Sequence, residues 1–286
     1  MIGQGIGYVK GHGTQNDFIV LPDADALLDL TTNRVQALCD RRRGLGADGV
    51  LRIVPTELVA EVAKQGSVAQ WFMDYRNADG STSEMCGNGA RLFARVLLDH
   101  GLMNTESFSI ATRGGPREIT LSGDDIAVEM GRALVVDVEQ PIFVTAEGRQ
   151  WPVTAVNFPN PHAVAFVDSL EEVGSLLEQP TISPSSLFPE GVNVEFASIQ
   201  GEDHVRFRVF ERGVGETRSC GTGACAVAWA YRKRTGQPST NSPVVIDVPG
   251  GRLRVHERAD GRWVLTGPTE VVAAGTILSQ WWKDNE

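Results

Sequence analysis

The sequence is poor in cysteine and has no long hydrophobic run. Its 286 residues include four cysteines, Cys39, Cys86, Cys220 and Cys225, which are too few for a disulfide-stabilised scaffold of this length. None belongs to a C-x-x-C pair, and no histidines cluster near Cys220 and Cys225, so we expect no metal site. No apolar run approaches the ~20 residues that a membrane-spanning helix needs.

Positive charge is also scarce. The chain has 26 Lys and Arg against 36 Asp and Glu, a formal net charge of −10, which does not favour binding to nucleic acid or to an anionic membrane. The first residues, 1–13, contain no apolar stretch typical of a signal peptide. Apolar residues make up 42% and charged residues 22%, as in ordinary globular proteins. We therefore expect a cytoplasmic protein with neither nucleic acid nor membrane as partner.

Short β-rich runs separated by Asx-Gly turns dominate the pattern. Two alternating stretches, 117–121 and 126–130, are separated by a turn and predict a hairpin. Helical patterns are fewer. One follows Thr32 and is expected to end near Arg43, with Gly44 as the stop signal. Strands with isolated helices indicate an α+β fold rather than a regular βαβ array.

A repeat organises the chain. Cys86-Gly87-Asn88-Gly89-Ala90 and Cys220-Gly221-Thr222-Gly223-Ala224 share the pattern C-G-x-G-A. Each precedes a mostly apolar helical segment, 90–98 and 224–231; the first keeps only Arg91 and Arg95 polar, and the second should be buried all round. Weaker echoes relate Asn16-Asp17-Phe18 to Asn160-Pro161-His162 and Gly46-Ala47-Asp48 to Gly191-Val192-Asn193. We expect two related domains, residues 1–131 and 132–274, that face each other across a cleft.

A cysteine directly before a glycine-rich helix start can be chemically active. The helix N-terminus offers N–H groups and a partial positive charge, which bind a carboxylate and lower the pKa of a thiol. Two such thiols, Cys86 and Cys220, could exchange protons on opposite faces of one carbon, as racemisation of an amino acid requires. His162 and Glu211 are candidates for tuning the thiol pKa values. The plainer interpretation is a turn before a helix, and for Cys39 and Cys225 we expect core packing.

The chain resembles diaminopimelate epimerases over nearly its whole length. The resemblance rests on eight ordered motifs: His12-Gly13-Thr14-Gln15-Asn16-Asp17-Phe18, Gly44-Leu45-Gly46-Ala47-Asp48-Gly49, Asn77-Ala78-Asp79-Gly80-Ser81, Met85-Cys86-Gly87-Asn88-Gly89-Ala90-Arg91, Asn160-Pro161-His162, Gly191-Val192-Asn193, Glu211-Arg212-Gly213-Val214-Gly215-Glu216-Thr217 and Cys220-Gly221-Thr222-Gly223-Ala224.

The resemblance implies a homodimeric, cofactor-independent epimerase that interconverts LL- and meso-diaminopimelate in lysine and cell-wall precursor synthesis. It implies two pseudo-symmetric α+β domains, each a curved, mostly antiparallel, barrel-like sheet around a central helix, with the active site between them. The C-terminal residues 275–286 would complete the first domain, with 277–282 as a strand.

The same resemblance assigns roles to individual residues. Cys86 and Cys220 would be the acid and base, with His162 and Glu211 adjusting their ionisation, and no metal would take part. The α-carboxylate would bind backbone N–H groups of Gly87, Asn88, Gly221 and Thr222. The remaining substrate groups would be held by Asn16, Asn77, Asn160, Asn193, Glu211 and Arg212.

Three alternatives stay open. A proline or hydroxyproline racemase of the same fold would carry His where this chain has Asn88. Gly44–Gly49 matches the G-x-G-x-x-G pattern of dinucleotide-binding loops, but it follows a helical segment and precedes a β-like one, the reverse of what such a loop needs. A redox module would require Cys86 and Cys220 to form a disulfide.

Overall fold

The computed structural model describes residues 5–136, 140–237 and 242–286, and the chain folds into two compact units. The first unit comprises Met1–Val128 and Pro268–Glu286, and the second comprises Glu129–Gly267. The expected domain limits lie at residues 131/132 and 274/275, so the C-terminal segment joins the first unit earlier than expected. The reason is a long last strand, which begins at Glu270.

Among its described residues, the first unit has a sheet and three α-helices. Its strands are β1 (Gly5–Gly13), β2 (Asn16–Pro22), β3 (Gly49–Pro55), β4 (Trp71–Asn77), β5 (Ser107–Ala111), β6 (Arg117–Ser122), β7 (Asp125–Gly131), which runs past the unit's limit, and β19 (Glu270–Leu278). Its helices are α1 (Thr32–Cys39), α2 (Gly87–Asp99) and α4 (Ser279–Asp284), with short 3₁₀ turns at Thr56–Leu58 and Ala63–Gln65.

The second unit has more strands and one α-helix among the described residues. Its strands are β8 (Leu134–Val135), β9 (Ile142–Ala146), β10 (Arg149–Phe158), β11 (Asn160–Phe166), β12 (Thr181–Ser183), β13 (Asn193–Gly201), β14 (His204–Glu211), β15 (Gly215–Thr217), β16 (Val244–Val248), β17 (Gly251–Glu257) and β18 (Trp263–Gly267). The helix is α3 (Gly221–Thr235), and 3₁₀ turns occupy Leu170–Val173 and Ser185–Leu187.

Both units repeat one order of strand pairing. In the first, β1–β2 is antiparallel, β2–β3 parallel, β3–β4 antiparallel, β4–β5 parallel, and β5–β6–β7 antiparallel. In the second, β10–β11, β11–β13, β13–β14, β14–β16 and β16–β17–β18 follow the same sequence of directions. The helices α2 and α3 occupy equivalent places, between β4 and β5 and between β14 and β16. The α+β class and the predicted internal repeat are confirmed.

The strand register corrects one of the weaker sequence similarities, the match between residues 46–48 and 191–193. Phe18 of β2 is paired with Gly49 of β3, whereas His162 of β11 is paired with Asn193 of β13. With Phe18 and His162 equivalent, Asn193 therefore corresponds to Gly49, and the expected match to Asp48 is wrong by one residue. The reason is that Asp48 stays outside β3 and uses its carboxylate to accept a hydrogen bond from Asn16.

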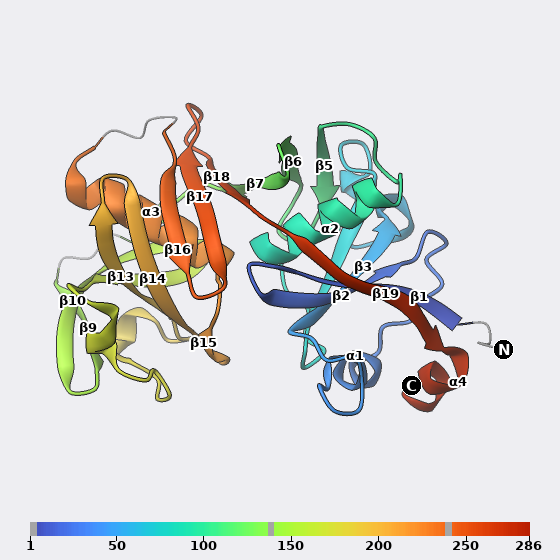
Figure 1. Ribbon diagram of the computed structural model, residues 1–286, viewed down its shortest axis with the longest axis horizontal. Helices are drawn as coiled ribbons and strands as arrows, with labels where there is room; N and C mark the ends of the chain where they lie inside the picture. The colour runs from blue at the N-terminus through green and yellow to red at the C-terminus, as the bar shows by residue number, and fades with distance from the viewer. Residues whose placement is uncertain (1–4, 137–139, 238–241) are drawn as a thin grey trace. The chain divides into compact units, whose positions relative to one another are not determined.

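The central helices are buried as their apolar sequences require. In α3, nearly every residue from the start of the helix to Arg232 is buried, and Trp229 is half-buried. Its neighbours are strands β10, β11, β13, β14 and β16–β18, several of which lie beside it in Figure 1. In the first unit, α2 contacts β1 to β4. A helix that is apolar all round is stable only inside such a wrapping of strands.

Two predicted elements end differently in the structure. The first helix begins after its cap Thr31 and ends at Cys39 rather than Arg43, because the Asp40 carboxylate accepts the backbone N–H groups of Arg42 and Arg43 and turns the chain. The expected C-terminal strand over 277–282 stops at Leu278, and α4 follows.

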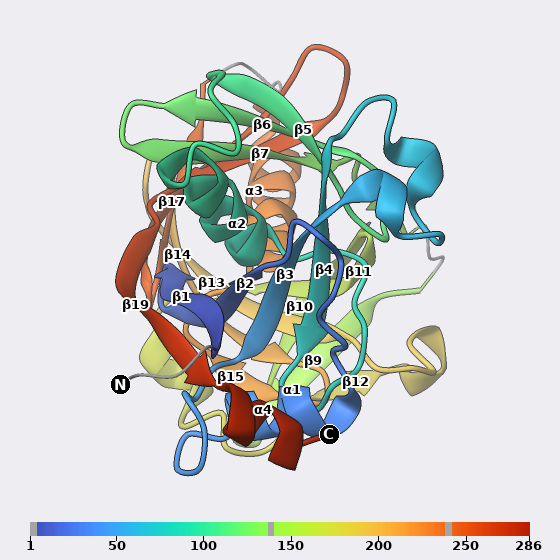
Figure 2. The same ribbon diagram turned by 90° about the vertical axis from the view of Figure 1, so that its right-hand side faces the viewer.

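The C-terminal helix completes a core of the first unit. Trp282 of α4 packs with Val35, Leu38 and Cys39 of α1, and the Arg34 guanidinium lies 5.0 Å from the centroid of the Trp282 ring. Figure 2 shows α1 and α4 side by side. The burial of Cys39 here confirms its predicted packing role, and burial raises its thiol pKa to about 12.

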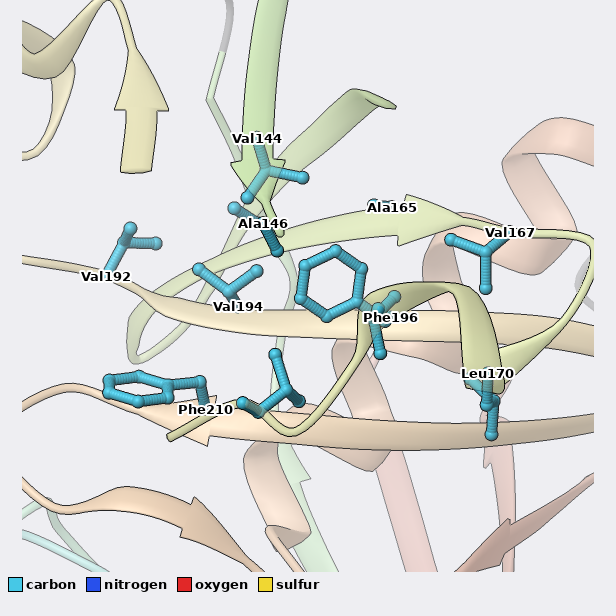
Figure 3. Packing of buried hydrophobic residues seen from close by; sticks show 12 residues of the cluster. Val144, Ala146, Ala165, Val167, Leu170, Val192, Val194, Phe196 and Phe210 are labelled. Atoms are coloured by element: carbon cyan, nitrogen blue, oxygen red, sulfur yellow. The ribbon is translucent and has the colours of Figure 1, made fainter. Parts of the chain in front are cut away.

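In the second unit, a second core lies on the face of strand β13 that points away from α3 (Figure 3). Val194 and Phe196 of β13 pack there with Val144 and Leu170. Because side chains alternate along a strand, the residue between them, Glu195, points to the opposite face. That face is covered by α3, since a Cβ atom placed on Gly223 would lie 2.8 Å from Glu195 Oε1.

Among the described residues, no helix combines the length and the apolar character needed to cross a membrane.

The ion pairs at Asp17 predict an acid-sensitive contribution to stability. Burial by itself would raise the pKa of Asp17, but hydrogen bonds from Arg41 and Lys10 lower it to about 2. The folded-state pKa is thus below the unfolded value, so the stabilisation is present above about pH 4 and is lost as the pH falls toward 2. Asp17→Asn should lower the melting temperature at pH 7 and make little difference near pH 2. As a control, Asp25→Asn, at an exposed position, should leave the melting temperature unchanged at both pH values. An equal effect of Asp17→Asn on the melting temperature at pH 7 and near pH 2 would contradict the prediction.

Candidate active site

Each central helix begins directly after a cysteine whose sulfur caps it. Cys86 and Cys220 both have extended backbones, and each sulfur accepts the backbone N–H of the third helical residue, Gly89 or Gly223, at 3.4 Å. Cysteine is not among the preferred N-cap residues, which are Ser, Thr, Asp and Asn. The two matched caps place both sulfurs at the partly positive end of a helix, where an anion is stabilised.

The glycines of the motif allow a strand to approach the helix closely. A Cβ atom on Gly89 would lie 3.3 Å from Leu51 Cδ2, and one on Gly223 would lie 2.8 Å from Glu195 Oε1. At the second distance, a side chain at position 223 would have to displace the Glu195 carboxylate. In each unit the third strand of the repeat, β3 or β13, therefore packs directly against the first turn of the central helix.

Asn16 and Asn88 meet beside Cys86. The Cys86 sulfur lies 3.7 Å from Asn16 Oδ1, which also accepts a hydrogen bond from Asn88 Nδ2 at 3.2 Å. The other end of the Asn16 amide donates to the Asp48 carboxylate at 2.8 Å. Three predicted site residues, Asn16, Cys86 and Asn88, are thus brought together, and Asp48 orients them.

Arg91 is a buried cation that the sequence analysis treated only as part of a polar helical stripe. Its guanidinium donates to Asn88 Oδ1 at 3.0 Å and to Thr14 Oγ1 at 3.2 Å. A further bond reaches the carbonyl of Gly87 at 3.4 Å. The fully buried Arg91, just after the first turn of the helix, therefore holds Asn88 in place.

Glu211 and Thr222 lie beside Cys220. The Glu211 carboxylate is hydrogen-bonded to Cys220 and also accepts the hydroxyl of Thr217. Thr222 Oγ1 is 3.4 Å from the Cys220 sulfur. The predicted tuning residue Glu211 thus touches its cysteine directly.

His162 is bonded to a carboxylate that sequence reasoning missed. Its Nδ1 lies 2.7 Å from Glu195 Oε1, and both side chains are fully buried. Its Nε2 lies 3.1 Å from Asn160 Oδ1. One signal in the sequence could have revealed Glu195: it is a single charge within the apolar run Val194–Ala197, which lies in a buried strand.

The ionisation of Cys220 differs from expectation. Burial, followed by the charges of Glu211 and Glu195, raises the pKa of the Cys220 thiol well above its usual value, although bonds from Thr222 and the Gly223 N–H oppose the shift. Burial also raises the pKa of Glu211. The net shift at Cys220 is therefore upward, opposite to the lowering predicted for a thiol at a helix N-terminus, and burial is its largest cause.

The other predicted substrate contacts are held by their own loops. Asn77 accepts the Tyr75 hydroxyl at 2.6 Å and donates to Ser81 Oγ at 3.0 Å. Asn193 is buried and accepts the backbone N–H of Arg212 at 3.0 Å. It therefore shapes the turn after β14 that carries the Arg212 side chain.

The remaining candidates of the sequence analysis are accounted for by packing. The segment 44–49 follows α1 and leads into β3, which is the wrong context for a dinucleotide-binding loop. Cys225 is buried in α3, as expected of a core residue, and none of the four cysteines, all within the described residues, forms a disulfide. Among the described residues, no three His, Cys, Asp or Glu side chains are grouped so that they could hold a metal ion.

Comparison with known proteins identifies close relatives. The family model described as diaminopimelate epimerase matches residues 8–136 and 154–272. A diaminopimelate epimerase of Streptomyces coelicolor is 49% identical over 283 residues, which cover 96% of each chain. The corresponding protein of Mycobacterium tuberculosis strain CDC 1551 is 43% identical over 291 residues, covering 96% of this chain and 98% of that one.

Solved structures of distant relatives share the fold. A PhzF-family phenazine biosynthesis protein of Bacillus anthracis matches with a TM-score of 0.72 at 16% identity, over 96% of this chain and all of that one. A hydroxyproline epimerase of Agrobacterium vitis, with bound trans-4-hydroxy-L-proline, matches with a TM-score of 0.68 at 14% identity, over 96% and 92%. At such low identity these likenesses show the fold alone. Because the family model and the relatives span nearly its whole length, the chain belongs to the diaminopimelate epimerase family.

Proposed function

We propose that this protein interconverts LL-2,6-diaminopimelate and meso-diaminopimelate by moving a proton at one α-carbon, without a cofactor. The observation that supports this most directly is the matched pair of sulfur-capped helices, one in each half of an internal repeat. Epimerisation needs one base on each face of the carbon, and a duplicated unit supplies two equivalent ones. Membership of the family agrees with this substrate.

The proposed reaction uses one thiolate and one thiol. The thiolate takes the α-proton as the C–H bond breaks, and the electron pair is delocalised into the carboxylate. The thiol then gives its proton to the opposite face of the same carbon, so no net oxidation occurs and the two sulfurs exchange protonation states. Cys86 and Cys220 must therefore reach the two faces of one α-carbon, and each serves as acid in one direction and as base in the other.

The raised pKa of Cys220 favours the protonated form of that sulfur. We therefore propose that Cys220 is a thiol before substrate binds and that it starts as the proton donor. For the opposite direction it must ionise, and an ammonium group bound by Glu211 would favour this because it offsets the negative charge that raises the pKa. Substrate binding would thereby help to prepare the base.

The helix starts would stabilise the carbanion-like transition state. Backbone N–H groups of Gly87, Asn88, Gly221 and Thr222 would hold the α-carboxylate, where negative charge grows as the proton leaves. Fixed donors at such a position lower the barrier because they need no reorganisation. Amide and guanidinium groups suit the second carboxylate and ammonium of diaminopimelate; these contacts are proposed for Asn16, Asn77, Asn160, Asn193 and Arg212.

The wider setting follows from the substrate. Diaminopimelate epimerisation would place the protein in lysine and peptidoglycan precursor synthesis in the cytoplasm. By the same resemblance it would act as a homodimer.

Removal of either sulfur should end epimerisation. Cys86→Ala and Cys220→Ala should each reduce activity on LL-diaminopimelate below detection, because one of the two faces lacks its acid or base. Each variant should still fold, with its melting temperature lowered only by the loss of one helix cap. A single Cys→Ser variant should still exchange an α-proton with D₂O, measured by mass spectrometry. Cys39→Ala, which alters only the core of the first unit, should remain active. Epimerisation by either alanine variant would contradict the two-base mechanism.

Removing the charge of Glu211 should make Cys220 more reactive. In Glu211→Gln the pKa of Cys220 should fall, so alkylation of Cys220 by iodoacetamide at pH 8 should become several-fold faster, because only the thiolate reacts. Peptide mass spectrometry measures the rate, with Glu216→Gln as the control that leaves it unchanged. Alkylation that is equal or slower in Glu211→Gln would refute the assigned cause of the pKa shift.

Arg212 should act mainly on binding. Arg212→Ala should raise the KM for diaminopimelate by roughly 10- to 100-fold with a smaller change in kcat, the scale of one lost charge-assisted hydrogen bond. Arg206→Ala removes an exposed arginine of the same strand region and should leave KM unchanged. A normal KM in Arg212→Ala would remove Arg212 from the site.

A further inference from the structure

The two halves of the repeat differ beneath their catalytic helices. By strand register, Leu51 of β3 corresponds to Glu195 of β13, because Leu51 is paired with Val20 and Glu195 with Val164, two residues beyond Phe18 and His162. Both lie against the equivalent glycine of the helix, Gly89 or Gly223. The first unit thus has an apolar side chain where the second has a carboxylate.

The neighbouring position differs in the same way. Phe18 corresponds to His162, and a Cβ atom on Gly89 would lie 3.5 Å from the Phe18 ring. An apolar pair, Phe18 and Leu51, therefore supports the helix at Cys86, and a hydrogen-bonded pair, His162 and Glu195, takes its place in the unit of Cys220.

Packing alone does not require a carboxylate at position 195. The Glu195 side chain is fully buried, and its Oε2 atom has no hydrogen-bond partner among the described residues. A buried, partly satisfied carboxylate is costly, and a buried polar pair can often be replaced as a whole by apolar residues of similar size without loss of stability. Leu51 shows that the repeat accommodates leucine there. A chemical role therefore accounts for the carboxylate better than packing does.

We propose that Glu195 is a positioning residue that fixes the tautomer and ring orientation of His162 and, through it, the Asn160 amide. A carboxylate can only accept, so the 2.7 Å contact requires His162 Nδ1 to carry hydrogen. In a neutral ring Nε2 is then an acceptor, so Asn160, whose side-chain oxygen lies 3.1 Å from Nε2, completes a hydrogen bond by turning its Nδ2 group toward the ring. A continuous chain thus runs from a buried anchor to an amide proposed to contact substrate.

The same carboxylate also acts on the acid–base groups. Its charge contributes to the raised pKa of both Cys220 and Glu211, while His162 acts in the opposite sense on Glu211. The two cysteines therefore differ in their surroundings. Cys220 lies near the charged side chain of Glu195, whereas the corresponding strand position near Cys86 holds the apolar Leu51. This inference rests on the proposed function for its kinetic consequence and on geometry for its structural one.

The test compares two substitutions of Glu195. Glu195→Leu copies the first unit and removes the acceptor, whereas Glu195→Gln keeps an acceptor oxygen of the same shape. We expect Glu195→Leu to fold with a lower melting temperature, because the buried Nδ1–H group of His162 loses its acceptor. It should also lose on the order of tenfold or more in kcat/KM for diaminopimelate, the scale at which removing the carboxylate partner of a metal-bound histidine acts. Glu195→Gln should keep more of the activity. Glu202→Gln, an exposed acid in the turn after β13, should match the wild type.

A spectroscopic measurement separates positioning from a merely structural role. ¹⁵N shifts of His162, assigned by their absence in His162→Asn, should show hydrogen on Nδ1 in the wild type and loss of that fixed state in Glu195→Leu. An unchanged His162 pattern in Glu195→Leu would overturn the inference, whatever the kinetics. If Glu195→Leu does not fold, Glu195→Gln is compared with the wild type instead. The inference would be overturned if Glu195→Gln had wild-type kinetics and neither the wild type nor Glu195→Gln carried hydrogen on His162 Nδ1. Wild-type protein that does not epimerise diaminopimelate would refute the proposed function and leave the ¹⁵N comparison to decide the role of Glu195.

Discussion

A cysteine sulfur that accepts the N–H group of the third residue of a helix is the interaction on which the candidate site depends. It occurs twice, at 3.4 Å in both units, and it fixes each sulfur at the end of a buried helix. The position combines two properties that proton transfer at an amino acid requires: a thiol that can gain and lose a proton, and neighbouring backbone donors for a carboxylate. The strands around each helix hold these groups in place, so the geometry does not have to form during the reaction.

The structure gives these two equivalent positions unequal surroundings. Cys86 is partly exposed beside the amides of Asn16 and Asn88, and the buried Arg91 holds the Asn88 amide. Cys220 is buried, and it adjoins Glu211 and the Glu195–His162 pair. Burial and the nearby carboxylates raise the pKa of Cys220 and so favour its protonated form, because a thiolate there would add negative charge where there is little water. A symmetric scaffold thus supports a pair in which one sulfur can be acid while the other is base.

Regular features of the fold followed well from local patterns. The hairpin of β6 and β7, the starts of α2 and α3, and the burial of Cys225 depend on residues close in sequence, where alternation, glycines and apolar periodicity act directly. Ends of elements were less predictable. The first helix stops early because Asp40 captures two backbone N–H groups, and the last residues form α4 because Trp282 is buried against α1. Both outcomes depend on a side chain whose partner is not visible in a periodic pattern.

The sequence by itself determined the duplicated Cys-Gly-x-Gly-Ala motif, and with it two glycine-rich helix starts and a pair of candidate acid–base residues. Only the tertiary structure decided which side chains surround each sulfur. Glu195 meets His162 because parallel pairing of β11 and β13 brings residues 33 positions apart together, and strand alternation turns Glu195 toward α3. The ionisation of Cys220 was likewise a tertiary outcome, because desolvation and the charges of nearby carboxylates depend on burial and distance in space, which residue order alone does not specify.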